Sequence, residues 1–180
     1  MYNNCMKKIY HTWQDVEKQC AEILRQLSNS EWRPDYIVGL TRGGLVPANL
    51  LSQYLEVPME TLKVSLRDSS QTEHNCWMAE DAFGGYTDPI NPKRYVHKNI
   101  LVVDDINDTG ATLNWIMRDW QESCHPDNVL WNGIWNNNVR FAVLVNNEAS
   151  EFKRIDYSAV EINKAEEESW IVFPWEDWWK

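Results

Sequence analysis

Near the start of the chain, apolar residues fall at the spacing of one helix face: Val16, Cys20, Ile23, Leu24 and Leu27. Thr12 precedes this stripe and is a residue type that caps helix N-termini. Pro34 and Asp35 interrupt the pattern. The sequence therefore predicts an amphipathic helix that begins after Thr12.

Further along the chain, short continuous apolar runs alternate with segments typical of helices. The clearest run is Ile100-Leu101-Val102-Val103, as expected for a parallel strand covered on both faces. The expected strands are residues 36–40, 57–66, 100–103, 141–145, 157–162 and 170–173, and the expected helices are 45–55 and 111–122. This order predicts an open, mostly parallel α/β sheet flanked by helices, with the last two strands completing the sheet.

Two segments show neither the helical nor the strand periodicity of apolar residues. Residues 69–97 are polar and contain Gly84-Gly85, Pro89 and Pro92, and residues 124–138 are rich in Asn and Trp. A long irregular segment in a compact domain is usually a lid or a binding loop, so residues 69–97 are a predicted flexible lid. No repeat or low-complexity linker is visible, and residues 1–180 are expected to form a single domain.

Composition narrows the class of protein. The formal net charge is −10, which argues against nucleic acid as the main partner. The apolar runs are too short to cross a membrane, and the first residues do not resemble a secretory signal, so a cytoplasmic location is expected. Four scattered cysteines form no zinc-binding spacing.

The candidate chemistry lies in residues 100–112. The apolar strand delivers Asp104 and Asp105 to its carboxyl end, where open α/β sheets bind ligands. The chain then turns through Thr109-Gly110, and a helix begins at once with its unpaired N–H groups facing the loop. We expect Asp108, Thr109, Gly110, Ala111 and Thr112 to cradle a phosphate monoester. The two aspartates suit ribose hydroxyls or a Mg²⁺ ion, bound directly or through water.

Other interpretations of this segment are weaker. Two adjacent aspartates alone are most simply a solvated surface. An EF-hand is excluded because the twelfth position counted from Asp105 is Ile116 rather than Glu. Response-regulator receiver domains place such an aspartate pair at their start. Only 68 residues follow Thr112 in this chain, too few for the rest of a receiver domain.

The whole string Ile100–Thr112 resembles the signature of type I phosphoribosyltransferases, which bind phosphoribosyl pyrophosphate (PRPP). Gly39-Leu40-Thr41-Arg42-Gly43-Gly44-Leu45-Val46-Pro47-Ala48 resembles the pyrophosphate loop of the xanthine-guanine and hypoxanthine enzymes of that family. The resemblance implies that Thr41, Arg42, Gly43 and Gly44 bind pyrophosphate, in a loop that often contains a cis peptide.

The C-terminal segment extends the resemblance to the base. Glu168-Ser169-Trp170-Ile171-Val172-Phe173-Pro174-Trp175-Glu176 resembles the segment in which a tryptophan stacks on the purine and the next backbone reads its edge. Residues 157–180 are thus a predicted base-binding hood and tail. Relatives that use 6-oxopurines carry a lysine where this chain has Asn147. Asn147, Trp170 and Ile171 are the predicted base contacts, and adenine or a modified base stays open.

The resemblance implies a function. The chain is expected to transfer ribose 5-phosphate from PRPP to a purine-type nucleobase, with Mg²⁺ as cofactor and release of pyrophosphate. Asp108 is expected near N7 as proton acceptor or as a hydrogen-bond partner. Four cations lie near the predicted lid, Arg67, Lys93, Arg94 and Lys98, and the residues do not single out one for pyrophosphate. A homodimer or higher homo-oligomer is expected. The alternatives are a non-catalytic regulatory protein of the same fold that binds PRPP or a nucleotide, a pyrimidine acceptor, and an interaction protein that docks through its Trp-rich tail.

Overall fold

The computed structural model describes residues 7–64, 76–84, 86–87 and 95–179. Its elements, in chain order, are β1 (Lys7–Tyr10), α1 (Trp13–Asn29), β2 (Tyr36–Thr41), α2 (Leu45–Leu55), β3 (Met59–Lys63), α3 (Cys76–Phe83), β4 (Tyr86–Thr87), β5 (Tyr95–Val96), β6 (Ile100–Asn107), α4 (Ala111–Ser123), a 3-10 helix (Val129–Gly133), β7 (Val139–Asn147), β8 (Tyr157–Ile162) and β9 (Ser169–Val172). None of the described helices is long and apolar enough to cross a membrane.

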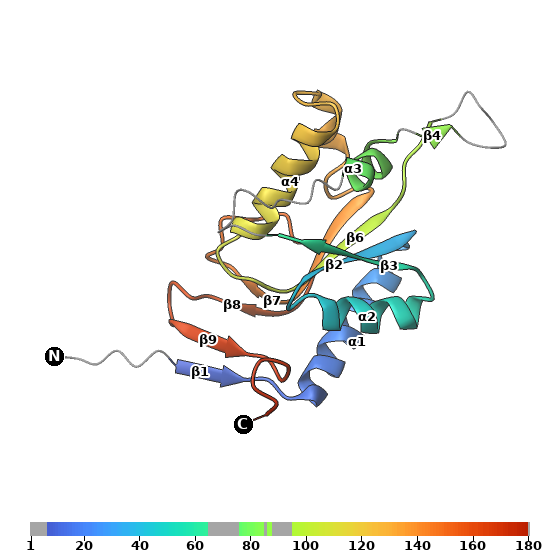
Figure 1. Cartoon of the computed structure of the whole chain (residues 1–180). Coiled ribbons are helices and arrows are strands. Elements are labelled where there is room, and N and C mark those ends of the chain that lie inside the picture. Colours follow the sequence, from blue (N-terminus) through green and yellow to red (C-terminus); the bar gives the residue numbers. More distant parts are fainter. Residues whose placement is uncertain (1–6, 65–75, 85, 88–94, 180) are drawn as a thin grey trace.

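A five-stranded parallel sheet forms the centre of the fold, in the order β3-β2-β6-β7-β8. Helices α1 and α2 cover one face, and α3 and α4 cover the other (Figure 1). The predicted α/β class and parallel sheet are therefore confirmed. The carboxyl ends of β2 and β6 lie next to each other in this order, so the loops that follow them meet at one edge of the sheet.

The apolar patterns explain both cores. On α1, the buried residues include Val16, Cys20, Ile23 and Leu27, which pack with α2 and the sheet. Thr12 caps α1: its Oγ1 accepts from the backbone N–H of Asp15, and the Asp15 carboxylate accepts from the backbone N–H of Thr12. The other core holds the large aromatic side chains Trp120, Trp131, Trp135, Phe141 and Phe152.

The last strand differs from the prediction. Residues 170–173 were expected to complete the main sheet, but β9 instead pairs in parallel with β1, a strand that the pattern did not predict. These two strands form a small separate sheet, here called the hood, which stands beside the β8 edge of the main sheet (Figure 1). Because four-residue strands carry little periodicity, the sequence could not distinguish pairing with the main sheet from pairing with β1.

The prediction that residues 69–97 are irregular throughout is partly wrong, whereas their role as a lid stays a prediction. Within residues 69–97, Cys76–Phe83 forms helix α3, and Met78, Ala79 and Ala82 are buried in the core beside α4. Asp81 is fully buried, accepts from Lys98 Nζ at 3.1 Å and receives the Lys98 backbone N–H through its carbonyl. Lys98 is thus engaged in holding α3. Residues 69–75 and 88–94, with Arg67, Lys93 and Arg94, lie outside the described residues.

Candidate active site

The loop after β2 presses against the second half of strand β6. A Cβ atom added to Gly43 would lie 1.9 Å from Asp105 Oδ2, and one added to Gly44 would lie 2.4 Å from the Val103 carbonyl oxygen. Only glycine permits this approach. The peptide bond between Thr41 and Arg42 is cis, and the Arg42 side chain is exposed. The structure therefore brings the predicted pyrophosphate loop into contact with the predicted acidic pair.

Burial shapes the chemistry of the acidic pair. The pKa of Asp104 is raised well above its ordinary value by burial and by the neighbouring Asp105 charge. Burial also raises the pKa of Asp105 to about 6, and the Glu176 carboxylate adds to the shift. Asp104 Oδ1 accepts the backbone N–H of Asp105 at 3.0 Å. When these buried carboxyl groups are ionised, few neighbouring groups stabilise their negative charge. A cation or the hydroxyl groups of a sugar would therefore be favourable neighbours.

The donor set fits a hydrated magnesium ion better than a closed metal cage. Among the described residues, no group of three or more His, Cys, Asp or Glu side chains is placed to hold a metal. Asp104 and Asp105 supply carboxylate oxygens only, which Mg²⁺ prefers, and this ion commonly completes its shell with water and phosphate oxygens.

The start of α4 has the geometry expected of an anion cradle. Gly110 has φ of +86° and caps the helix without a side-chain hydrogen bond. A Cβ atom at this position would lie 2.4 Å from the Phe152 backbone nitrogen, so glycine is required both for the turn and for the packing. Thr109 Oγ1 accepts the Ala111 backbone N–H at 3.3 Å. A cavity of about 240 Å³ lies at this helix start and is lined by residues 104–113.

Buried amides hold the end of β6. Asn107 is 1% exposed and donates through Nδ2 to Asn146 Oδ1 at 2.8 Å and to the Phe152 carbonyl at 3.0 Å. Its Oδ1 accepts from Ser150 Oγ at 2.8 Å. Sequence reasoning missed this network, because nothing in a lone asparagine indicates which distant backbone it contacts. The network fixes the loop after β7 against the cradle.

Asn147 lies at the end of β7, the strand end where it was predicted, and its side chain contacts backbone groups. Its side chain is 6% exposed, and its Nδ2 donates to the Asp108 carbonyl at 2.9 Å. Its Oδ1 accepts the backbone N–H groups of Ala149 at 3.1 Å and Lys164 at 3.0 Å. These contacts favour a supporting role for Asn147 rather than direct contact with a base.

Lys164, which sequence reasoning did not single out, lies beside Asp108 and Trp170. Its Nζ lies 2.9 Å from Asp108 Oδ1 and 6.0 Å from the centre of the Trp170 ring. The Lys164 side chain is mostly buried, with 16% exposed, whereas Trp170 is about half exposed, at 48%. The only sequence signal was a lysine two residues after a strand end.

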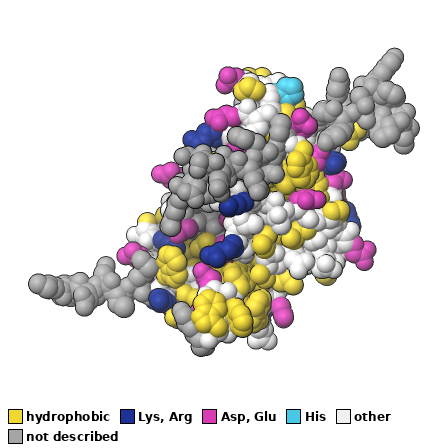
Figure 2. Space-filling model, viewed as in Figure 1, with side chains coloured by type: hydrophobic (Ala, Val, Ile, Leu, Met, Phe, Trp, Pro, Cys, Tyr) yellow, Lys and Arg dark blue, Asp and Glu magenta, His cyan; other side chains and the backbone are white. Residues whose placement is uncertain are grey.

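Two more cavities adjoin the first through Asp108. One, of about 580 Å³, is lined by Asp108, Trp170 and residues of the turn before β9, including Lys164. A smaller one, of about 80 Å³, lies between the acidic pair and the hood and includes Ile171. Figure 2 shows basic, acidic and hydrophobic side chains close together on this face. Asp108 borders all three of these cavities and Trp170 borders two of them, whereas residues 41–44 of the predicted pyrophosphate loop line none of the three.

Another cavity, of about 540 Å³, lies between the C-terminal ends of α1 and α2 and contains none of the predicted site residues. Its lining includes Trp32, Arg33 and Tyr54. The lining of this cavity does not combine carboxylates with a helix N-terminus. It therefore does not match the phosphate and metal chemistry predicted from the sequence.

Comparison with known proteins agrees with the geometry. The family model described as "Phosphoribosyl transferase domain" matches residues 6–177. A hypoxanthine-guanine phosphoribosyltransferase of Schizosaccharomyces pombe is 25% identical over 131 residues, 63% of this chain and 60% of the relative. A xanthine-guanine phosphoribosyltransferase of Cereibacter sphaeroides is 26% identical over 94% of this chain and 87% of its own length. The crystal structure of a purine phosphoribosyltransferase from Pyrococcus horikoshii superposes with a TM-score of 0.61 at 24% identity, covering 96% of each chain, which shows a shared fold.

Proposed function

This chain belongs to the phosphoribosyl transferase family, and we propose that it transfers ribose 5-phosphate from PRPP to a purine-type nucleobase and releases pyrophosphate. The observation that carries the proposal is the contact of Gly43 with Asp105 beside the start of α4, where the N-cap residue Gly110 offers no side-chain hydrogen bond. One short path along the sheet edge thus offers groups for pyrophosphate, ribose and 5-phosphate. The names of the relatives, which are purine enzymes, support the acceptor class. We take residues 1–180 as one such domain.

Each part of PRPP has a matching group. The 5-phosphate would accept hydrogen bonds from the backbone of residues 108–112 at the start of α4. The ribose hydroxyls would donate to the carboxylates of Asp104 and Asp105. Pyrophosphate would lie on residues 41–44, where the guanidinium of Arg42 offers a planar set of donors. When bound, Mg²⁺ would be held by Asp104 and Asp105 and would neutralise charge on the pyrophosphate.

The reaction exchanges one bond at C1 of the ribose for another. The bond from C1 to the pyrophosphate oxygen breaks with its electron pair, and N9 of the base forms the new bond to C1. The proton on N7 of the base passes to Asp108, which lies between the cradle and the base side. Asp104 and Asp105 stabilise the positive charge that grows on the sugar, so catalysis depends on positioning and electrostatics.

A direct assay tests this function. The purified protein with PRPP and MgCl₂ should form nucleotide and release pyrophosphate with at least one of hypoxanthine, guanine, xanthine and adenine. Removal of Mg²⁺ by EDTA should abolish the product, and uracil should serve as the pyrimidine control. Binding of PRPP without turnover of any base would favour the non-catalytic regulatory alternative, and absence of PRPP binding would reject the proposed site.

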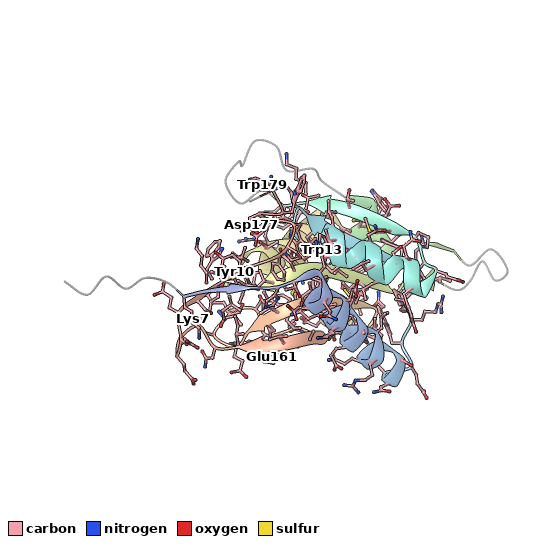
Figure 3. The ribbon with its side chains drawn as sticks, turned by 90° about the horizontal axis from the view of Figure 1, so that it is seen from below. Lys7, Tyr10, Trp13, Glu161, Asp177 and Trp179 are labelled. Atoms are coloured by element: carbon pink, nitrogen blue, oxygen red, sulfur yellow. The ribbon has the colours of Figure 1, made fainter. Side chains whose placement is uncertain are left out.

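The proposal also includes the oligomeric state of the protein. A homodimer or higher homo-oligomer stays a prediction, which light scattering of the purified chain would test. Exposed aromatic side chains from both chain ends gather at the hood, where the rings of Trp13 and Trp175 lie 6.0 Å apart. Figure 3 places Tyr10 and Trp13 on the same side of the molecule as Asp177 and Trp179.

A further inference from the structure

One peptide of the proposed phosphate cradle is oriented by a loop that is distant in sequence. The Thr109 carbonyl oxygen accepts the backbone N–H of Glu151 at 3.1 Å. The peptide bond between Thr109 and Gly110 is trans, as Thr41–Arg42 is the only cis bond among the described residues. In a trans peptide the carbonyl and the N–H point in opposite directions. The Gly110 N–H therefore points away from Glu151.

Two buried side chains hold this loop, which comprises residues 148–152 after β7. Ser150 is 2% exposed, and its Oγ donates to Asn107 Oδ1 at 2.8 Å and accepts the backbone N–H of Phe152 at 3.2 Å. Asn107 donates in turn to the Phe152 carbonyl oxygen at 3.0 Å. The Asn107 amide thus has partners for both its oxygen and its nitrogen, as a buried amide requires. The loop is therefore tied to the end of β6, just before the cradle.

The same loop packs directly against the turn of the cradle. A Cβ atom at Gly110 would lie 2.4 Å from the Phe152 nitrogen and 2.8 Å from Ser150 Oγ. The Gly110 carbonyl oxygen accepts the N–H of Asn114 at 3.0 Å, a hydrogen bond of the first turn of α4. The backbone of Gly110 is thus fixed both by the loop and by the helix. A shift of the loop would consequently change the orientation of the peptide that precedes the helix.

We propose that Asn107 and Ser150 are positioning residues for the 5-phosphate. Through the loop they hold the Thr109–Gly110 peptide with its N–H toward the phosphate. The groups that would touch the phosphate come from residues 108–112, and the loop decides how one of them points. A reversed peptide would present a carbonyl oxygen, which repels an anion, in place of a donor. The inference rests on the proposed function and adds two residues that touch no substrate.

Equilibrium binding isolates the contribution of the 5-phosphate. Guanosine 5′-monophosphate and guanosine share the base and the ribose, and guanine occurs in the names of two relatives. The ratio of their dissociation constants, measured by calorimetry on the full chain, therefore reports on the phosphate. The wild type should bind the nucleotide about 100-fold more tightly, as expected for two hydrogen bonds to a charged group. In NMR spectra of the wild type, the Gly110 amide resonance should shift with the nucleotide and stay in place with guanosine.

Two pairs of variants test the loop. Glu151→Pro removes the N–H that the Thr109 carbonyl accepts and should lower this ratio by about tenfold, the loss of one hydrogen bond to a charged group. Glu151→Ala keeps the N–H, loses only an exposed side chain and should match the wild type. Ser150→Ala should also lower the ratio. Its control, Ser52→Ala, removes a buried hydroxyl that donates to the Val57 carbonyl at the far end of α2 and should not. The affinity for guanosine should stay that of the wild type in all four.

The outcomes separate this inference from the proposed function. An unchanged ratio in either Glu151→Pro or Ser150→Ala, once its melting curve shows it folded, would overturn the inference and leave the proposed function standing. Equal loss of affinity for nucleotide and nucleoside would do the same. A Gly110 resonance that does not respond to the nucleotide would overturn the inference without any variant. Failure of the wild type to bind PRPP would reject the proposed function, and the inference with it.

Discussion

On the phosphate side of the site, residues 104–112, every group comes from one continuous strand–loop–helix segment, whereas the base side draws Asp108, Asn147, Lys164 and Trp170 from four different places in the chain. The phosphate side depends on backbone groups and on glycines that permit close approach. The base side depends on side chains held by tertiary hydrogen bonds. In the proposed site, one local segment thus supplies the groups of the phosphate side, whereas the base side depends on how distant strand ends meet.

Gly110→Ala should produce the largest effect, because it breaks the phosphate side and its contact with the loop after β7. The new methyl group would meet the Phe152 nitrogen, at a residue with φ of +86°. We expect destabilisation of about 3 kcal/mol or more and loss of PRPP binding. Urea unfolding followed by fluorescence measures the first effect. Gly133→Ala is the control, since a Cβ atom there meets no atom within 4 Å.

Asp108→Asn acts where the two sides meet. Turnover should fall by about 10²-fold, the usual scale for a positioned proton-transfer group, while PRPP binding survives. Steady-state kinetics with the preferred base measures the change. A double-mutant cycle with Lys164→Gln should show coupling, because the two side chains form an ion pair. Turnover equal to that of the wild type would remove Asp108 from catalysis.

Asp105→Asn should stabilise the folded protein and weaken its function. This outcome would show that the charge of Asp105 on the phosphate side serves function at the expense of stability. Burial raises the pKa of Asp105 from 3.8 to about 6, so the folded protein holds the extra proton between these values. Stability therefore falls as the pH rises through that window, and the cost remains above it.

The expected gain for Asp105→Asn is roughly 3 kcal/mol at pH 7, shrinking toward zero below about pH 4, as measured by urea unfolding at each pH. A gain that did not change with pH would assign the effect to packing rather than to charge.

Thr12→Ala should have the smallest effect and lies outside both sides. Loss of the capping box at α1 should cost about 1 kcal/mol of stability. The KM for PRPP and the preference between bases should remain those of the wild type. A changed base preference in this variant would mean that stability loss alone alters selectivity, so that base preference would not report on the base side.

How much the sequence predicted follows the same division. The segment from Ile100 to Thr112 was recognisable because strand, carboxylates, glycine and helix start are contiguous. Helix α3 was missed because it has only eight residues and lies between polar segments. So short a helix shows little periodicity of apolar residues. Strand β1 was missed because its partner lies about 160 residues away. Lys164 was missed because its meaning depends on contacts with Asp108 and Trp170.

The sequence by itself determined the parallel α/β sheet, the cradle at α4 and the glycine loop, because each follows from local spacing and residue type. Only the tertiary structure decided that β9 pairs with β1, that Asn147 turns to backbone partners and that Lys164 stands beside Asp108. The physical reason is that neighbouring residues constrain backbone geometry directly. Contacts between distant strand ends exist only after the sheet has set their register.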